Sequence, residues 1–185
     1  MSGTDPRYPI GKYRPEVGLD GERRVELIAE IEALPLRLRG AVEGLAEDEW
    51  EQPYREGGWT VRQLVHHLAD SHMNAFMRFR LALTEDTPTI KPYLQDRWAE
   101  LPDVGHTPPE VSLVLLEALH RRWVDMLRGL PDEAFQRPLH HPEQQRTFPL
   151  EEMLSLYAWH GRHHVAHILS LRERLSPQGS LPLPD

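Results

Sequence analysis

Three histidines in this sequence have the residue type and spacing of a metal site. His160 and His164 lie four residues apart in the segment YAWHGRHHVAHI, and His67 lies far upstream in GWTVRQLVHHLADSH. On an α-helix, residues i and i+4 project from the same face, so two imidazoles can bind one ion. A third ligand must then come from another helix. Three neutral histidines leave coordination positions open, which is typical of a catalytic zinc-type site rather than a closed structural one.

Composition narrows the chemistry further. The 185 residues contain no cysteine, so any metal must be bound through nitrogen and oxygen atoms. The formal net charge of −8 argues against a nucleic-acid partner, because phosphate binding needs a basic face. No apolar run has the length of a membrane span, and the first residues lack the pattern of a secretory signal. We expect a cytoplasmic protein, a single domain over residues 1–185, with no membrane partner.

Four segments have the apolar periodicity of long helices. They cover about residues 21–45, 60–83, 108–128 and 149–176. Asp20 is the expected cap of the first, and Pro35 should kink or split that helix. Thr107 and Glu110 have the spacing of a capping box for the third.

The segments between these helices differ in composition. Residues 1–19 are rich in proline, glycine and tyrosine and predict an N-terminal arm. Residues 84–109 carry five prolines, and a loop of this length is often functional. The segment RPLHHPEQQRTF is predicted to be irregular, and no strand-like alternation competes with the helices. The sequence therefore predicts an all-α four-helix bundle with long loops.

Helical periodicity sorts the histidines of the last helix. His164 falls within the apolar seam, His160 and His167 fall at its edge, and His163 points further out. A single buried histidine is ordinarily satisfied by hydrogen bonds. The pair His160 and His164 is harder to explain in that way, since burying two polar rings together costs a few kcal/mol unless something coordinates or pairs with them.

The second helix leaves two alternatives open. Its apolar stripe places His72, not His67, in the core, while His67 joins a polar stripe with Ser71, Asn74 and Arg78. That polar stripe either lines a pocket at the edge of the bundle or is a solvated helix face. His66 points away from both stripes and is predicted at the surface.

Four stretches of the chain form a recognisable set: YPIGKYRP, the Trp59 and Thr60 that lead to HHLADSH, LALTEDTPTIKPY, and YAWHGRHHVAHI. Together they resemble the DinB-like superfamily, and within it the YfiT branch of metal-dependent hydrolases and bacillithiol S-transferases. The resemblance covers almost the whole chain. It implies an up-down-down-up bundle, a homodimer, and one zinc or nickel ion bound by three histidines. The histidine before Leu-Ala-Asp, here His67, would be the first ligand, and His160 and His164 the other two.

Three functions compete on these grounds. The first is transfer of a low-molecular-weight thiol such as bacillithiol, activated at the ion, to a small electrophilic substrate. The second is hydrolysis by hydroxide formed at the same ion, and the third is a metal-stabilised bundle that binds small molecules without turnover. No general base is assigned. Supporting candidates, each of which is more often a surface or packing residue, are Asn74, Arg78, His163, Tyr54, Arg55, Trp98 and His141.

Overall fold

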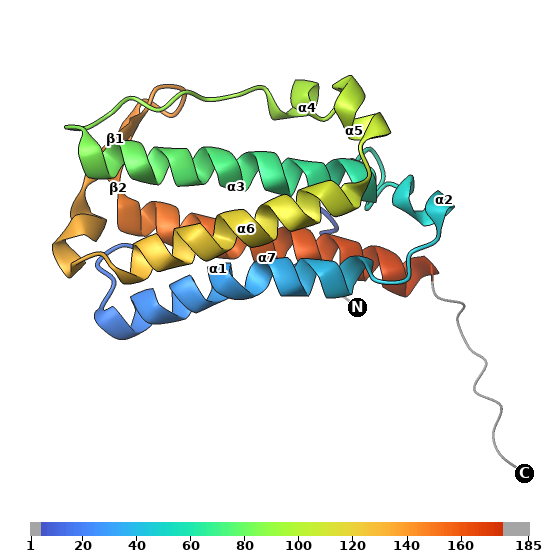
Figure 1. Ribbon diagram of the computed structural model, residues 1–185, viewed down its shortest axis with the longest axis horizontal. Coiled ribbons are helices and arrows are strands. Elements are labelled where there is room, and N and C mark those ends of the chain that lie inside the picture. The colour runs from blue at the N-terminus through green and yellow to red at the C-terminus, as the bar shows by residue number, and fades with distance from the viewer. Residues whose placement is uncertain (1–4, 176–185) are drawn as a thin grey trace, which may run out of the picture.

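The computed structural model describes residues 5–175, in which four long helices form a bundle (Figure 1). These helices are α1 (Gly21–Val42), α3 (Val61–Thr84), α6 (Pro109–Arg128) and α7 (Leu150–Leu175). Shorter elements are α2 (Glu47–Trp50), α4 (Gln95–Trp98), α5 (Pro102–His106) and the 3-10 helix η1 (Asp132–Gln136). The predicted all-α four-helix bundle is confirmed.

The four long helices do not alternate in direction. α1 and α7 run one way along the bundle, and α3 and α6 run the other way (Figure 1). Both α1 and α3 pack against α6 and α7. Because α3 and α6 are parallel, residues 85–108 must return along the whole bundle, and this connection carries α4 and α5.

The helix starts expected near Asp20 and Thr60 have side-chain caps, whereas the capping box expected at Thr107 is absent. The side chain of Asp20 accepts a hydrogen bond from the backbone of Arg23, and Thr60 and Gln63 form a reciprocal capping box. At α6, Pro108 is the capping residue and no side-chain cap is present. Proline at the first helical position fixes φ for the helix, so α6 begins one residue too late for Thr107 to cap it.

Two further expectations are corrected. For Pro35 the sequence predicted a kink or a split, and the split does not occur, because α1 is one continuous helix that includes Pro35. The segment predicted to be irregular contains a hairpin of β1 (Pro138–His141) and β2 (Arg146–Pro149). Buried Leu139 and Phe148 face each other across it. Strands of four residues are too short to show a clear alternation in the sequence.

The core consists of two apolar clusters, one toward each end of the bundle. Along each long helix, residues of one cluster are followed by residues of the other. On α3, α6 and α7, histidines lie at the boundary between the two clusters. At the same level Gly161 lets α7 approach α1 closely, since a Cβ atom there would lie 2.7 Å from Cδ2 of Leu34. The middle of the bundle is thus a polar layer between two apolar ones.

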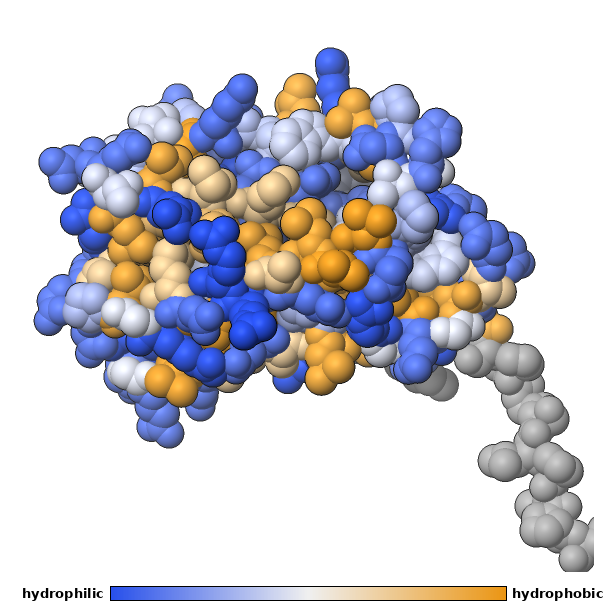
Figure 2. Space-filling view, viewed as in Figure 1, coloured by the Kyte–Doolittle hydropathy of each residue, from blue (hydrophilic) through white to orange (hydrophobic). Residues whose placement is uncertain are grey.

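The outer surface is mostly polar. Figure 2 shows apolar groups along the front of the bundle, where α6 exposes Val111, Val114 and Leu115. Among the described helices, none combines the length and apolar character needed to cross a lipid bilayer.

The N-terminal arm has no helix and packs on α7, as far as the structure describes it. The hydroxyl of Tyr13 donates to the backbone oxygen of Glu152 over 3.0 Å, and the carboxylate of Glu151 accepts from the backbone of Gly18 and Leu19. Residues 1–4 of the predicted arm lie outside the described residues. The arm therefore fixes one side of α7 near the candidate site.

Candidate metal centre

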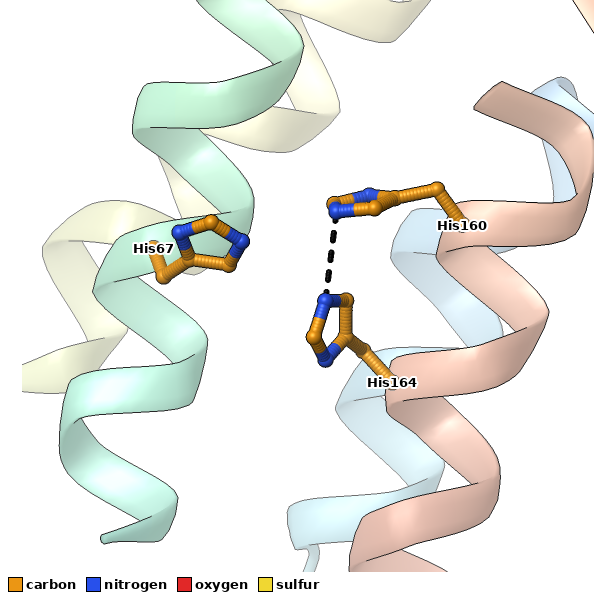
Figure 3. A group of neighbouring side chains, drawn as sticks. All are labelled: His67, His160 and His164. Carbon is orange, nitrogen blue, oxygen red and sulfur yellow. Dashed lines mark hydrogen bonds between the residues drawn. The ribbon is translucent and has the colours of Figure 1, made fainter. Parts of the chain in front are cut away.

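His67 of α3 and His160 and His164 of α7 point toward one another (Figure 3). One candidate ligand atom from each of the three side chains lies within 4.8 Å of the other two. The Nε2 atoms of His160 and His164 are 3.2 Å apart. The packing of α3 on α7 thus brings together three imidazoles from distant parts of the sequence.

The geometry of this cluster fits a small divalent ion. Two nitrogens bound to tetrahedral zinc at about 2.0–2.1 Å are separated by about 3.3 Å, close to the separation of the two Nε2 atoms. Nδ1 of His164 is buried and has no hydrogen-bond partner among the described residues. With an ion on Nε2, Nδ1 would carry the hydrogen of this ring, so the fit to an ion depends on the spacing of the Nε2 atoms.

Burial also keeps these rings in the form that binds metal. It lowers the pKa of His67 to about 4. Burial, together with the neighbouring imidazoles, lowers the pKa of His160 and of His164 well below the usual range. All three rings are therefore neutral near pH 7, and each has a lone pair available to an ion.

Two cavities meet at His160. A cavity of about 330 Å³ surrounds the three histidines and is lined also by Tyr54, Arg55, Trp59, Trp159 and His163. A cavity of about 610 Å³ is lined by Ser71, Arg78, Tyr93, His141 and Tyr157, among others. Gln95 and Asp96 of α4 line both cavities, as does His160. The ring of His160 is thus accessible from two spaces of small-molecule size.

The supporting candidates from the sequence separate into three groups. Tyr54, Arg55 and His163 lie around the smaller cavity, and Arg78 and His141 line the larger one. Trp98 packs on Tyr93, with ring centroids 4.6 Å apart. The side chain of Asn74 donates to the backbone oxygen of Asp70 and is among the lining residues of neither cavity. For Trp98 and Asn74 the structure favours the packing alternative.

The polar stripe of α3 lines a pocket in part, and both histidines between which the sequence left the choice open are buried. His72 is fully buried, as its position in the apolar stripe predicts, and His67 is also buried. His66, predicted at the surface, is buried against α6, where its Nδ1 lies 2.7 Å from the hydroxyl of Ser112. The helical wheel of one helix does not show that a second helix covers its other side.

Other residues of the site were not predicted. Gln95 and Asp96 lie in the proline-rich connection that the sequence marked as functional, but nothing in their own types singles them out. Tyr157 is buried on α7, and its ring lies 5.6 Å from that of His160. Trp59 stands just before the cap of α3 and packs on His67, with ring centroids 4.5 Å apart.

Known proteins resemble this chain closely. The sequence profile of the DinB superfamily matches residues 30–168. The Bacillus subtilis (strain 168) protein named "Putative metal-dependent hydrolase YfiT" is 46% identical over 175 residues, which are 95% of this chain and 98% of that protein. A Bacillus cereus (strain 03BB102) protein of the same description is 52% identical over 173 residues, 94% of this chain and 99% of that protein.

A solved structure extends the likeness to three dimensions. It is described as YfiT from Bacillus subtilis, "a probable metal-dependent hydrolase with an unusual four-helix bundle topology". The two folds superpose with a TM-score of 0.90 at 46% sequence identity, over 93% of this chain and 98% of the other.

Proposed function

This chain belongs to the DinB superfamily, and we propose that it is a metal-dependent enzyme whose zinc or nickel ion is held by His67, His160 and His164. The observation that carries the proposal is the convergence of three neutral ring nitrogens where two cavities meet. A purely structural ion would need no such access from two sides.

The reaction we assign is transfer of a low-molecular-weight thiol to an electrophile. When bound, the ion lowers the pKa of a small thiol or a water molecule and so supplies a nucleophile near neutral pH. In the transfer, the S–H bond breaks and its proton passes to solvent, sulfur bonds to a carbon of the electrophile, and the leaving group departs with its electron pair. Two cavities on either side of His160 suit a reaction of two small molecules. Because the chain has no cysteine, the thiol must come from a co-substrate.

Hydrolysis is the second candidate, and a separate observation favours it. The relatives from Bacillus subtilis and Bacillus cereus are named as metal-dependent hydrolases. In hydrolysis, water takes the place of the thiol as nucleophile. The two cavities would then hold different parts of one substrate.

A paired assay distinguishes the candidates. Metal-depleted protein is supplied with zinc or nickel, then mixed with a chromogenic alkylating electrophile and either bacillithiol or cysteine, and in parallel with ester and amide substrates but no thiol. If the protein transfers a thiol, conjugation should require the ion and should vanish when a chelator is added. The conjugation rate should already rise with pH at values below the pKa of the free thiol, which is about 8.5. Cleavage without thiol would favour hydrolysis. If neither reaction exceeds the metal-free background while the ion is bound, the chain is a binding module.

The chain offers a matched control for the metal ligands. His164→Ala should abolish the ion-dependent rate. His66→Gln removes a neighbouring buried histidine of α3 that faces Ser112 instead of the cluster, and it should keep that rate.

A further inference from the structure

Pro35 leaves a backbone carbonyl of α1 without its partner in the helix. In an α-helix the carbonyl of residue i accepts from the N–H of residue i+4. Proline has no N–H, so the carbonyl of Ile31 is free to accept from elsewhere. Nδ1 of His120 on α6 lies 2.7 Å from this oxygen. A carbonyl oxygen can only accept, so Nδ1 of His120 must carry a hydrogen.

The hydrogen on Nδ1 of His120 determines the tautomers of the next two histidines, His72 and His160. A neutral imidazole has one N–H and one lone pair, so Nε2 of His120 must accept. Nδ1 of His72 lies 2.9 Å from it and must donate. Nε2 of His72 is then the acceptor for Nδ1 of His160, 3.2 Å away. The pattern ends with the lone pair of His160 on Nε2, the atom that faces His164.

We propose that Pro35, His120 and His72 are positioning residues that hold His160 in the tautomer with its hydrogen on Nδ1. The lone pair on Nε2 is thereby presented to the candidate metal centre before any ion arrives. The role toward an ion rests on the proposed function. The hydrogen pattern rests only on the contacts within the bundle.

Each long helix contributes one link to this chain of hydrogen bonds. α1 supplies the Ile31 carbonyl, α6 His120, α3 His72 and α7 His160. His72 is fully buried and His120 nearly so, and the ring of Trp123 lies edge-on to both. The polar rings are therefore satisfied by one another and shielded from water, which holds them in one arrangement.

The chain of hydrogen bonds stops at the backbone carbonyl of Ile31 on α1. The carbonyl cannot give or take a proton, but it fixes the direction of every hydrogen bond that follows. A hydrogen bond at the second nitrogen of a histidine ligand commonly fixes the tautomer and orientation of its ring and raises its basicity.

The hydrogen pattern can be tested without any ion. In metal-free protein labelled with ¹⁵N on histidine, long-range ¹H–¹⁵N spectra distinguish protonated from bare ring nitrogens. We expect His120, His72 and His160 all to carry their hydrogen on Nδ1. An Nε2 hydrogen on His72 or on His160 would overturn the proposal, whatever the metal results.

Variants of His120 test the coupling to the ion. Glutamine can donate from its amide nitrogen and accept at its oxygen, so His120→Gln should keep the Nδ1 hydrogen on His160 and an affinity for zinc close to the original. His120→Leu can do neither. It should give His160 a mixture of tautomers and weaken zinc binding by about 10–100-fold. His66→Gln, which lies outside the chain of hydrogen bonds, controls for the loss of a buried histidine.

Pro35→Ala guards against the possibility that His120→Leu fails to fold. Alanine supplies the missing N–H, which competes with His120 for the Ile31 carbonyl, and it is the better helix former. The variant should therefore fold at least as stably, yet show mixed tautomers at His160 and weaker zinc binding. A purely structural role for Pro35 would leave both unchanged.

The outcomes separate this inference from the proposed function. If the wild-type protein binds neither zinc nor nickel but shows the expected hydrogen pattern, the proposed function fails and the positioning of His160 stands. If the ion binds and folded His120→Leu or Pro35→Ala binds it as tightly as wild type, the coupling is refuted.

Discussion

Two histidine pairs on α7 have the same spacing and opposite surroundings. His160 and His164 have Nε2 atoms 3.2 Å apart, and His163 and His167 have Nε2 atoms 3.1 Å apart. The first pair is joined by His67 from α3. The second pair packs among aromatic rings: Trp159 is stacked on His163, and the ring of Tyr54 is tilted against that of His167 with centroids 4.2 Å apart.

Charge separates the pairs as well. Burial lowers the pKa of His167 to about 3, and the charges of Arg55 and Arg174 contribute to this lowering. Fixed positive charges oppose the binding of a cation at the same place. The spacing i, i+4 is therefore only a precondition for a metal site, and a third ligand together with the local charge determines which pair binds an ion.

The largest expected difference between the pairs is in metal content. Replacing His67, His160 or His164 by alanine should weaken metal binding by orders of magnitude, because one of three protein ligands is lost. His167→Ala should leave binding nearly intact. Elemental analysis after dialysis measures both, and an empty site in His167→Ala would remove the distinction between the pairs.

Acid should destabilise the metal-free protein by several kcal/mol. Burial lowers the pKa of His67 and of His120 to about 4. In the unfolded chain both histidines have a pKa of about 6.5. Between pH 6.5 and pH 4 the unfolded chain therefore binds protons at these histidines that the folded chain does not bind. The free energy of unfolding should be greatest above pH 6.5 and fall toward pH 4, by up to about 3 kcal/mol for each of these two histidines.

Denaturant titrations across this range measure the loss of stability. They also sharpen the comparison of the pairs. With saturating zinc, the free energy of unfolding should decrease only at lower pH, both in wild type and in a double variant with His163→Gln and His167→Gln. In a double variant with His160→Gln and His164→Gln, zinc should have only a weak effect on this pH dependence.

A smaller effect is expected from Gly161, which lies within the first pair. In Gly161→Ala the new Cβ meets the side chain of Leu34, and overpacking costs about 1–3 kcal/mol. Alanine regains about 1 kcal/mol in helix propensity, so a net loss of about 1 kcal/mol should appear in thermal unfolding. Movement of α7 should weaken zinc binding at His160 and His164 while the contact of His163 with His167, within one helix, persists. Unchanged zinc affinity would show that the site tolerates such a shift.

The smallest effect is expected at His163. It lines the cavity of about 330 Å³, and a single contact contributes about 0.5–1.5 kcal/mol. His163→Gln should therefore change kcat/KM by no more than about tenfold and leave metal content unchanged. A loss of metal in this variant would mean that the second pair takes part in binding the ion.

The sequence predicted the parts of this molecule that depend on a single helix. Apolar periodicity and caps at Asp20 and Thr60 placed the long helices, and the spacing of His160 and His164 indicated the site. The choice of His67 as third ligand came from resemblance, since periodicity alone favoured His72. It stays a prediction until metal binding is measured.

What the sequence did not predict depends on which helices are neighbours. The burial of His66 requires α6 to cover that side of α3. The contact of His72 with His120 joins residues 48 positions apart, and no local pattern signals it. Pro35 was recognised only as a helix breaker, because its effect on the Ile31 carbonyl matters only once α6 is in place.

The parallel course of α3 and α6 has a consequence for how such a protein can diversify. A bundle of alternating helices would join these two by a short turn, and the histidines would have no cover on that side. Here the returning connection, residues 85–108, lays Gln95 and Asp96 over the meeting point of the two cavities. Since this connection contributes little to the two apolar clusters, insertions or exchanges within it can reshape what enters the site while the histidine layer stays intact. Under the proposed function, the topology thus separates the part of the molecule that would select a substrate from the part that would hold the ion.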